Sequence, residues 1–388
     1  MESSARPAIE SNILIAPIEN RAEMRRFIEF PYQLYRGDPY WVAPLRAEQK
    51  ELFDTSKHPF WKRAEMRCFL AVSNGKVCGR VAAIDDHTHN RATGERLGTF
   101  AFYESIDSES VAHALLRSVR EWLSERGLTT LRGPLNPSIN YECGILVDGF
   151  DSIPCTMMSY NPPYYARLLE STGLRKIKDL FAFRLHLNET YHARRARLDR
   201  AVRVLATPSI RIRPVRLDRL EAEVDLIWNL HNSAWRENWG ASPFIREEIQ
   251  YLARQLKAIL IPDLALVAEI GDEPIAFGLC IPDINQALKH AKGSLFPSGF
   301  FKILYYKSKI KKLRVLALGV ASEYRDSGVA AQLYARLVQT GLDLGYNEAE
   351  CSWVVEDNRA MLRSLDFLGA ERYKTYRIYE SSLDRSFP

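Results

Sequence analysis

The segment from Leu316 to Ala330 contains residue types that suit the binding of an anion. An apolar strand leads into a turn and then into a helix whose start reads Arg325-x-x-Gly328-x-Ala330. The first N–H groups of a helix have no partner within it and lie at the positive end of its dipole. Gly328 and Ala330 leave this backbone accessible, and Arg325 adds a positive charge. The segment therefore predicts a pyrophosphate site, with a simple tight turn at Gly328 as the alternative.

A second motif downstream completes a known pattern. Arg325-x-x-Gly328-x-Ala330 matches the Q/R-x-x-G-x-G/A signature of the GNAT superfamily of acyltransferases, and the segment from Asn358 to Gly369-Ala370 resembles its second motif. The resemblance implies that acyl-CoA (coenzyme A) binds as co-substrate. In that family the strand before the signature contacts the pantetheine arm, the turn holds the pyrophosphate and the asparagine lies beside the cofactor. The corresponding positions here are Leu318, Gly319, Val320, Arg325, Asp326, Ser327, Gly328, Val329, Ala330 and Asn358.

The same resemblance raises the question of the catalytic acid and base. Many GNAT enzymes have a tyrosine seven residues after the motif asparagine, which protonates the leaving thiolate, but this chain has Leu365 there. Tyr373 and Tyr376 follow nearby and are candidates to replace it. A base must lie within about 3 Å of the amine proton, directly or through one water. The carboxylates that flank the expected cleft are Asp283, Glu356 and Asp357. Each of them could instead cap a turn or lie on the surface.

Two polar segments are candidates for binding the amine acceptor. The Pro/Gly-rich loop between Gly133 and Gly149 contributes Asn136, Asn140 and Glu142. These side chains could equally cap turns. A predicted helix has His231 and Trp235 on one face, and two further candidates, Asn238 and Trp239, follow it. A buried core position is the alternative for this aromatic group.

The order of predicted strands and helices repeats once along the chain. The first series is Ile13–Pro17, Arg21–Tyr35, Phe69–Val72, Val77–Ile84, Thr99–Glu104, Ser110–Arg126, Thr130–Leu135, Pro163–Ser171 and Leu180–Leu187. The second is Arg211–Val215, Glu221–Trp235, Ile245–Leu256, Leu264–Ile270, Ile275–Cys280, Leu313–Gly319, Val329–Leu344, Glu348–Trp353, Arg359–Phe367 and Arg372–Tyr379. The repeat predicts an α/β (α+β) fold of two tandem GNAT-like domains, each a mostly antiparallel twisted sheet flanked by helices.

The two predicted domains differ at the anion site. In residues 13–187 the corresponding stretch has no glycine, and Glu104, Asp107 and Glu109 would repel a pyrophosphate. This domain is expected to keep the fold without binding acyl-CoA there, and to form a wall of the acceptor site. Residues 210–380 are expected to bind acyl-CoA. Residues 188–209, which are rich in arginine, are expected to form an exposed linker helix.

The positive charge of the chain is local. Residues 284–322 contain eight lysines and arginines and no acidic residue, so the rest of the chain has a formal charge of −3 within the total of +5. Apolar residues alternate with these lysines between Leu295 and Arg314. This combination predicts a peripheral contact with an anionic membrane surface. A helix packed on the core with a solvated basic flank is the alternative. Nucleic acid is not expected as a partner, because no nucleic-acid motif accompanies the patch.

Composition limits the remaining classes. The 388 residues suffice for two domains, and 46% of them are hydrophobic. No apolar run is long enough to span a bilayer, and the first residues do not read as a signal peptide. The six cysteines are scattered without metal-ligand spacing, which indicates reduced thiols, a cytoplasmic location and no bound metal.

Taken as a whole, residues 13–380 resemble the bacterial GNAT-type acyltransferases that acylate a sphingoid base, the bacterial ceramide synthases. The resemblance implies an N-acyltransferase that uses a long-chain acyl-CoA and a lipid-like amine. With the basic segment, it predicts a cytoplasmic enzyme at the inner face of the membrane. Two alternatives stay open. One is an N-acetyltransferase for a small molecule or a protein amine. The other is a non-catalytic acyl-CoA sensor, which Leu365 favours. The sequence does not indicate an oligomeric state.

Overall fold

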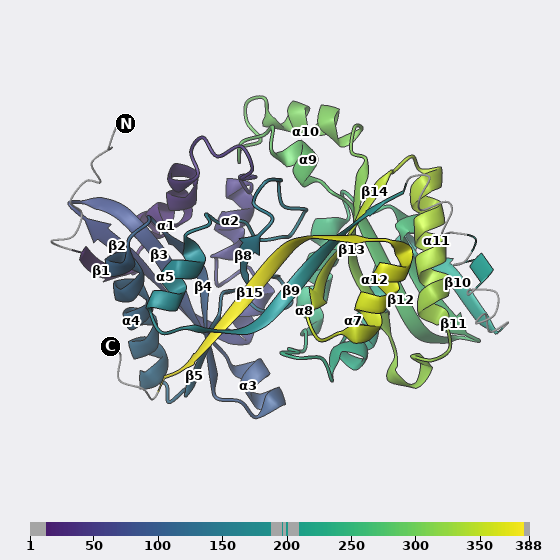
Figure 1. The fold of residues 1–388 in the computed structure, drawn as a ribbon, viewed down its shortest axis with the longest axis horizontal. Coiled ribbons are helices and arrows are strands. Elements are labelled where there is room, and N and C mark those ends of the chain that lie inside the picture. Colours follow the sequence, from purple (N-terminus) through teal and green to yellow (C-terminus); the bar gives the residue numbers. More distant parts are fainter. Residues whose placement is uncertain (1–12, 188–195, 197–198, 201–208, 384–388) are drawn as a thin grey trace.

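The structure is a computed structural model of the chain, and it describes residues 13–187, 196, 199–200 and 209–383. We call residues 13–187 the first half and residues 209–383 the second half. The predicted linker helix at 188–209 lies mostly outside the described residues. Strands and helices alternate in both halves, and the predicted mixed α/β class is confirmed (Figure 1).

The elements of the first half follow the predicted ranges within a few residues. They are β1 (Ile13–Pro17), α1 (Arg21–Leu34), α2 (Arg46–Leu52), η1 (Pro59–Lys62), β2 (Ala64–Ser73), β3 (Lys76–Asp86), α3 (His87–Thr93), β4 (Leu97–Ser105), α4 (Glu109–Glu125), β5 (Thr130–Gly133), β6 (Leu135–Asn136), β7 (Glu142–Cys143), β8 (Ile145–Asp148), α5 (Tyr165–Ser171) and β9 (Arg175–His186). The short elements α2, α3 and β6 to β8 were not expected from the sequence.

In the second half, too, the predicted elements lie close to the observed ones, whereas the helices Asn285–Leu288 and Gly299–Lys307 were not among the predicted ranges. Its elements are β10 (Ile210–Pro214), η2 (Leu217–Arg219), α7 (Leu220–Trp235), α8 (Arg246–Leu256), η3 (Pro262–Leu264), β11 (Ala265–Ile270), β12 (Glu273–Pro282), α9 (Asn285–Leu288), α10 (Gly299–Lys307), β13 (Lys312–Val320), η4 (Ser322–Tyr324), α11 (Val329–Asp343), β14 (Glu348–Val355), α12 (Arg359–Leu368) and β15 (Glu371–Ser382). The basic segment identified in the sequence therefore contains α9, α10 and β13.

One sheet runs through both halves. Its strand order is β1-β2-β3-β4-β5-β15-β9-β14-β13-β12-β11-β10, with β8 beside β15. The halves exchange their last strands, because β15 lies between β5 and β9 whereas β9 lies between β15 and β14. In Figure 1 these two long strands cross the middle of the molecule side by side. The exchange joins the two predicted sheets into one.

Most neighbouring strands are antiparallel, but each half contains one parallel pair. In the first half β4 pairs with β5, and in the second half β13 pairs with β14. The second pair is hydrogen-bonded only from Lys312 to Val315 on β13, although β13 continues to Val320. Beyond Val315 the two strands are no longer paired with each other. This opening of the sheet positions the candidate site.

The helices bury an apolar face against the sheet, as their periodicity predicts. On α4 the side chains of Val111, Leu115, Val119 and Leu123 are fully buried. The Ser108 hydroxyl caps this helix by accepting a hydrogen bond from the N–H of Val111 at 3.4 Å. Among the helices that the structure describes, none has the length and apolarity that crossing a bilayer requires. All six cysteines are buried free thiols.

Candidate active site

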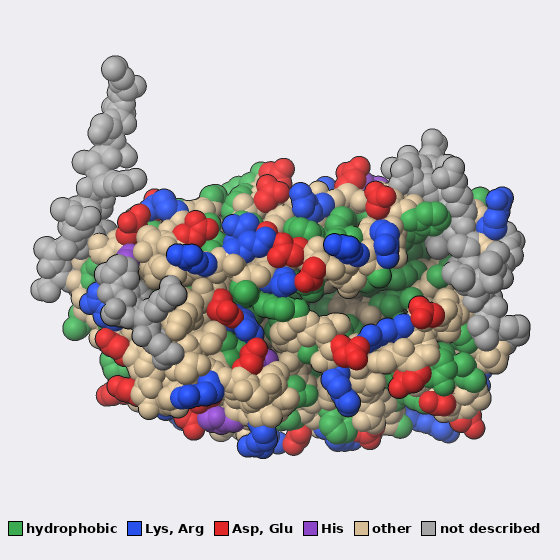
Figure 2. Space-filling model, turned by 60° about the horizontal axis from the view of Figure 1, so that its bottom comes forward, with side chains coloured by type: hydrophobic (Ala, Val, Ile, Leu, Met, Phe, Trp, Pro, Cys, Tyr) green, Lys and Arg blue, Asp and Glu red, His purple; other side chains and the backbone are tan. Residues whose placement is uncertain are grey.

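A large cavity lies where β13 and β14 diverge. Its volume is about 870 Å³, within the range of small-molecule sites. Its walls come from β13, β14, the end of α7 with the loop after it, and the start of α12. The first half contributes residues 139–141, Cys143, Met157 and Leu180. The surface in Figure 2 is hollowed to the right of centre, and acidic and basic side chains are interspersed over this face. Both halves thus build one site.

Five of the predicted coenzyme A residues line this cavity. They are Leu318, Gly319, Val320, Arg325 and Asn358. At Gly319 a Cβ atom would lie 2.4 Å from a ring carbon of Trp235, so only glycine lets this indole pack on β13. Asn358 also caps α12, because its Oδ1 accepts a hydrogen bond from the N–H of Met361 at 3.1 Å.

The turn from η4 to α11 contains the other five predicted cofactor residues, Asp326, Ser327, Gly328, Val329 and Ala330, which do not line the cavity. Gly328 has φ 76° and ψ 3°, the left-handed region that favours glycine, and it precedes α11 without a side-chain cap. The Ser327 hydroxyl accepts a long hydrogen bond, 3.4 Å, from the N–H of Val329. The helix therefore begins with amides that remain accessible to an anion.

Arg325 lies where this turn meets the cavity. Its guanidinium makes an exposed ion pair of 2.9 Å with Glu237 and donates a hydrogen bond to the carbonyl of Ala234 at 3.3 Å. Both partners belong to α7 or to the loop after it. The arginine is thus held near the turn by groups that an incoming diphosphate can replace.

Four of the six predicted acceptor-binding residues also line the cavity. They are Asn140, His231, Asn238 and Trp239. The other two, Asn136 and Glu142, do not line it. Asn136 Oδ1 accepts a hydrogen bond of 2.7 Å from the N–H of Phe102, and burial raises the pKa of Glu142. Asn140 donates to the carbonyl of Ser242 at 2.7 Å, which ties the first-half loop to the second half.

His231 is neutral at physiological pH. Its ring stacks on Trp235 with centroids 4.4 Å apart, and burial lowers its pKa to about 4. Its buried Nδ1 atom has no hydrogen-bond partner among the described residues. A neutral imidazole on a cavity wall adds no positive charge that would repel an amine.

The four predicted catalytic residues lie outside the cavity lining. Asp283 is buried and accepts hydrogen bonds from the N–H and hydroxyl of Thr156, at 2.9 and 3.0 Å. Glu356 accepts a hydrogen bond from Lys176 at 2.7 Å. Both carboxylates thus have partners that fix neighbouring loops and strands. Of the carboxylates considered, only Asp357 lines the cavity, and it pairs with Lys178 at 2.8 Å.

The two tyrosine candidates lie behind β14. Tyr373 donates its hydroxyl hydrogen bond to the buried carboxylate of Glu350. Tyr376 is fully buried and packs its ring at 85° to that of Trp353, with centroids 6.1 Å apart. Its hydroxyl has no partner in the described parts of the chain, and burial raises its pKa well above the usual value.

Three further residues with polar groups line the cavity, and the sequence analysis did not select them as site residues. Arg314 and Trp353 line it, and the buried atoms Arg314 Nε and Trp353 Nε1 have no acceptor among the residues described. A buried donor without an acceptor costs about 1–3 kcal/mol, so both atoms favour an acceptor. Ser352 also lines the cavity and donates to Glu350 at 2.7 Å. In the sequence Arg314 was noted only as part of the basic segment, and Trp353 and Ser352 do not belong to any motif that would mark them as site residues.

The corresponding turn of the first half is filled by protein. Glu104 is half-buried near the end of β4 and accepts hydrogen bonds from the hydroxyls of Tyr35 and Tyr165, at 2.7 and 2.6 Å. Burial raises the pKa of this carboxyl. Arg167 pairs with both Asp107 and Glu109.

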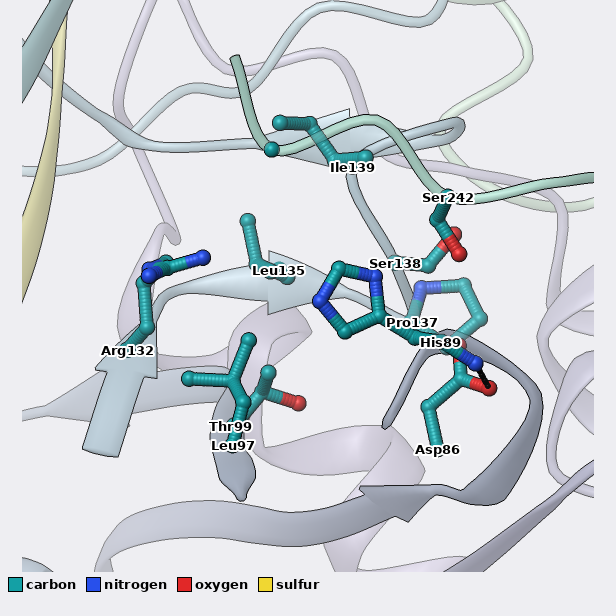
Figure 3. Close-up of a pocket in the computed structure, with 11 residues that line it drawn as sticks. Asp86, His89, Leu97, Thr99, Arg132, Leu135, Pro137, Ser138, Ile139 and Ser242 are labelled. Carbon is teal, nitrogen blue, oxygen red and sulfur yellow. Dashed lines mark hydrogen bonds between the residues drawn. The ribbon is translucent and has the colours of Figure 1, made fainter. Parts of the chain in front are cut away.

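A second, much smaller pocket lies between the halves. Its volume is about 20 Å³, room for roughly one water molecule. Figure 3 shows Asp86, His89 and Arg132 of the first half around it, with Ser242 of the second half above. Asp86 accepts a hydrogen bond from the N–H of His89 and pairs with Arg63 at 2.9 Å. The pocket is a packing defect at the junction and too small for a substrate.

Comparison with known proteins gives a consistent picture. Residues 224–369 match the model of the Acetyltransferase (GNAT) family. A protein of Caulobacter vibrioides (strain NA1000 / CB15N) named Bacterial ceramide synthase is 34% identical over 380 residues, 96% of this chain and 98% of that protein. Protein YghO of Escherichia coli (strain K12) is 33% identical over 377 residues, 95% of each chain. A solved structure, the tandem GNAT protein from the clavulanic acid biosynthesis pathway, shares the fold at 13% identity with a TM-score of 0.54, over 97% of this chain and 100% of that one.

Proposed function

The chain belongs to the GNAT family of N-acyltransferases, and from this premise we propose that it transfers a long-chain acyl group from coenzyme A to the amine of a sphingoid or similar lipid-like acceptor. One observation carries the proposal. Arg325, which lies three residues before the uncapped Gly328, lines the cavity between β13 and β14, and the first half supplies another part of its wall. A donor and an acceptor can therefore meet in one space.

The donor side fits coenzyme A. The diphosphate would bind the amides at the start of α11 and the Arg325 guanidinium, which would leave Glu237. The pantetheine arm would follow the unpaired stretch of β13, from Leu318 to Val320, whose backbone is free of β14. The thioester would then reach the part of the cavity lined by Arg314 and Trp353.

A long-chain substrate fits the apolar side of the cavity. Leu316, Tyr334, Val354 and Met361 line it together with three tryptophans, Trp235, Trp239 and Trp353. Such a wall stabilises an alkyl chain by about 0.8 kcal/mol for each buried methylene. The named relative from Caulobacter extends over both halves, so the comparison supports a lipid-like acceptor for the whole chain and not for one domain.

The chemistry requires three tasks. The amine nitrogen must attack the thioester carbonyl carbon and lose a proton, the carbonyl oxygen must be stabilised, and the C–S bond must break with the leaving thiolate protonated by solvent. The Arg314 guanidinium and the Trp353 indole, which line the cavity, would stabilise the carbonyl oxygen as it gains negative charge. Ser352, hydrogen-bonded to Glu350, would accept the amine proton and pass it toward the Glu350–Tyr373 pair. His231 would orient the neutral amine.

The test follows release of free thiol and the mass of the product. The protein is incubated with hexadecanoyl-CoA or acetyl-CoA, each with sphinganine or with a small soluble amine. We expect thiol release and an amide product with hexadecanoyl-CoA and sphinganine, and at least tenfold lower kcat/KM for the other pairs. A preference for acetyl-CoA with the soluble amine would make the protein an N-acetyltransferase. Binding of coenzyme A without thiol release for any amine would make it a sensor.

A further inference from the structure

The outer side of α10 and the loop before it exposes an unusual concentration of apolar side chains. Ten large hydrophobic residues of the described chain are exposed, and six of them lie between residues 295 and 305. These six, the α10 patch, are Leu295 (43% exposed), Phe296 (85%), Phe300 (55%), Phe301 (69%), Leu304 (60%) and Tyr305 (58%). Figure 1 shows α10 projecting from the top of the molecule, clear of the sheet. A contiguous apolar surface of this kind marks an interaction site.

The opposite side of α10 is anchored to the protein. Ile303 and Tyr306 are half-buried and pack against a cluster of Ile284, Ala287 and Ile310. Tyr306 also stacks on His290, with ring centroids 3.6 Å apart. The α10 patch is therefore the outer face of a fixed helix and its adjoining loop. It does not belong to the core, which removes the alternative of a core-packed helix for these six residues.

Positive charge surrounds the patch. The exposed lysines of the acid-free segment are Lys289, Lys292, Lys302, Lys307, Lys309 and Lys311. None of the six makes an ion pair with a carboxylate in the described ranges, whereas the two other basic residues of the segment, Lys312 and Arg314, are buried. These six charges are thus not neutralised by carboxylates of the described residues and can attract an external anionic surface.

We propose that the α10 patch and these six lysines form a docking surface for an anionic lipid bilayer. The phenylalanines and leucines would enter the headgroup region, and the lysines would contact acidic lipid headgroups. The apolar side chains stand on a projecting helix and loop. This shape suits insertion into a bilayer, whereas a rigid protein partner would need a matching hollow.

The docking surface is connected to the cavity wall. Asn285, at the start of α9, donates its N–H to the Thr156 hydroxyl at 3.2 Å and its side-chain amide to the Pro154 carbonyl at 3.0 Å. Met157, which follows Thr156 in the chain, lines the cavity. Docking would therefore bring one wall of the cavity close to the bilayer. The docking surface itself rests on the patch and the charges, and it does not depend on the proposed reaction.

Sedimentation with vesicles tests the docking surface. Vesicles of phosphatidylcholine alone are compared with vesicles that contain about one-third phosphatidylglycerol, at low and high NaCl. We expect the protein to bind only the anionic vesicles, and salt to weaken binding. Lys289→Glu, Lys292→Glu and Lys302→Glu together should lower the partition coefficient roughly 100-fold, at about 1 kcal/mol per lysine. These three are chosen because Lys307, Lys309 and Lys311 hydrogen-bond to other groups of the protein.

The apolar contribution has its own variant and controls. Phe296→Ser with Phe301→Ser should lower the partition coefficient at least tenfold. Leu14→Ser with Phe367→Ser removes exposed apolar groups elsewhere and should have no effect, as should Lys76→Glu. Melting temperature and coenzyme A affinity, measured without lipid, should stay unchanged in all variants. The docking surface is excluded if anionic vesicles do not bind the protein, or if the patch variants bind as well as the controls. It is also excluded if light scattering shows a dimer that only the phenylalanine variant dissociates.

Discussion

The turn between β4 and α4 and the turn between β13 and α11 have the same place in the two halves, since each leads from a strand to a helix beside a parallel pair. The first turn is closed. Ser108 caps α4 with its hydroxyl, Glu104 is hydrogen-bonded to Tyr35 and Tyr165, and two acids lie on the surface nearby. The second turn is open, because Gly328 has no side-chain cap and Arg325 lies beside it.

The helices α1 and α7, which lie near the closed and the open turn, differ in the same way. In the first half Tyr35, directly after α1, is buried and donates its hydroxyl hydrogen bond to Glu104. In the second half α7 ends with His231 and Trp235 on the cavity wall. One topology can therefore hold either a packed core or a binding site, and a few side chains around the turn decide which. The closed turn contributes stability, and we assign ligand binding to the open one.

The largest effect is expected from Gly328→Glu. The new side chain requires a positive φ and places a carboxylate where the diphosphate should bind, so the Kd for coenzyme A should rise more than 100-fold. Isothermal titration measures it. Gly328→Ala keeps the strain without the charge and should weaken binding less than tenfold. In the first half Asp107→Lys should leave the Kd within twofold. An equal loss there would mean that the closed turn also binds the ligand.

Tyr165→Phe should have the next largest effect, and on stability alone. Its hydroxyl donates to Glu104 and accepts from the N–H of Ser105 at 2.9 Å, both in a buried setting. Its loss should lower the free energy of unfolding by about 2 kcal/mol, measured by urea denaturation, without changing the Kd for coenzyme A. The matched change in the open turn, Tyr324→Phe, removes an exposed contact of 3.5 Å and should stay below about 0.5 kcal/mol.

Arg325→Ala should weaken coenzyme A about tenfold, because one charge-assisted contact to the diphosphate is lost. The loss should shrink as NaCl is raised, since part of it is an exposed electrostatic interaction. Arg167→Ala is the control in the closed turn, where the arginine pairs with Asp107 and Glu109. Its Kd should equal that of the unchanged protein. If both variants lose affinity equally, the assignment of Arg325 is wrong.

The smallest effect concerns acid stability. Burial lowers the pKa of His231 to about 4, below the 6.5 of an unfolded histidine. Between these pH values the unfolded chain binds one proton more than the folded chain. The contribution of neutral His231 to the free energy of unfolding is therefore complete above pH 6.5 and is lost as the pH falls toward 4. His231→Phe should reduce this slope by about 1 kcal/mol per pH unit between pH 6 and 5, in urea titrations at each pH. An unchanged slope would mean that His231 is protonated in the folded protein.

Local sequence patterns predicted the elements well, because burial on one face imposes a period of two on strands and of 3.6 on helices. The ranges of β1 and α4 show this, since their predicted and observed ends agree within one residue. The pairing of β15 with β5 and β9 could not be predicted in this way. Which strand lies beside which depends on contacts far apart in the chain, and single-strand patterns do not record them.

The turn at Gly328 was predictable as a strand-to-helix turn, because a glycine, an arginine and a helix start form a compact motif. The contributions of Arg314, Ser352 and Trp353 to the cavity were not. Arg314 and Trp353 become a pair only when β13 and β14 lie side by side, and nothing in their local sequences marks them. Asp283 and Glu356 were selected for their position near the expected cleft. Their hydrogen bonds to Thr156 and Lys176 depend on the first half, which the sequence of the second half does not reveal.

The exchange of β9 and β15 has a consequence for how the protein can be divided. Tyr379, on β15, is fully buried in the main apolar cluster of the first half, and Leu185, on β9, in that of the second. Separate expression of either half would leave an empty slot in its sheet and a bare strand edge prone to aggregation. Neither half should fold on its own, and the whole chain should unfold in a single cooperative step.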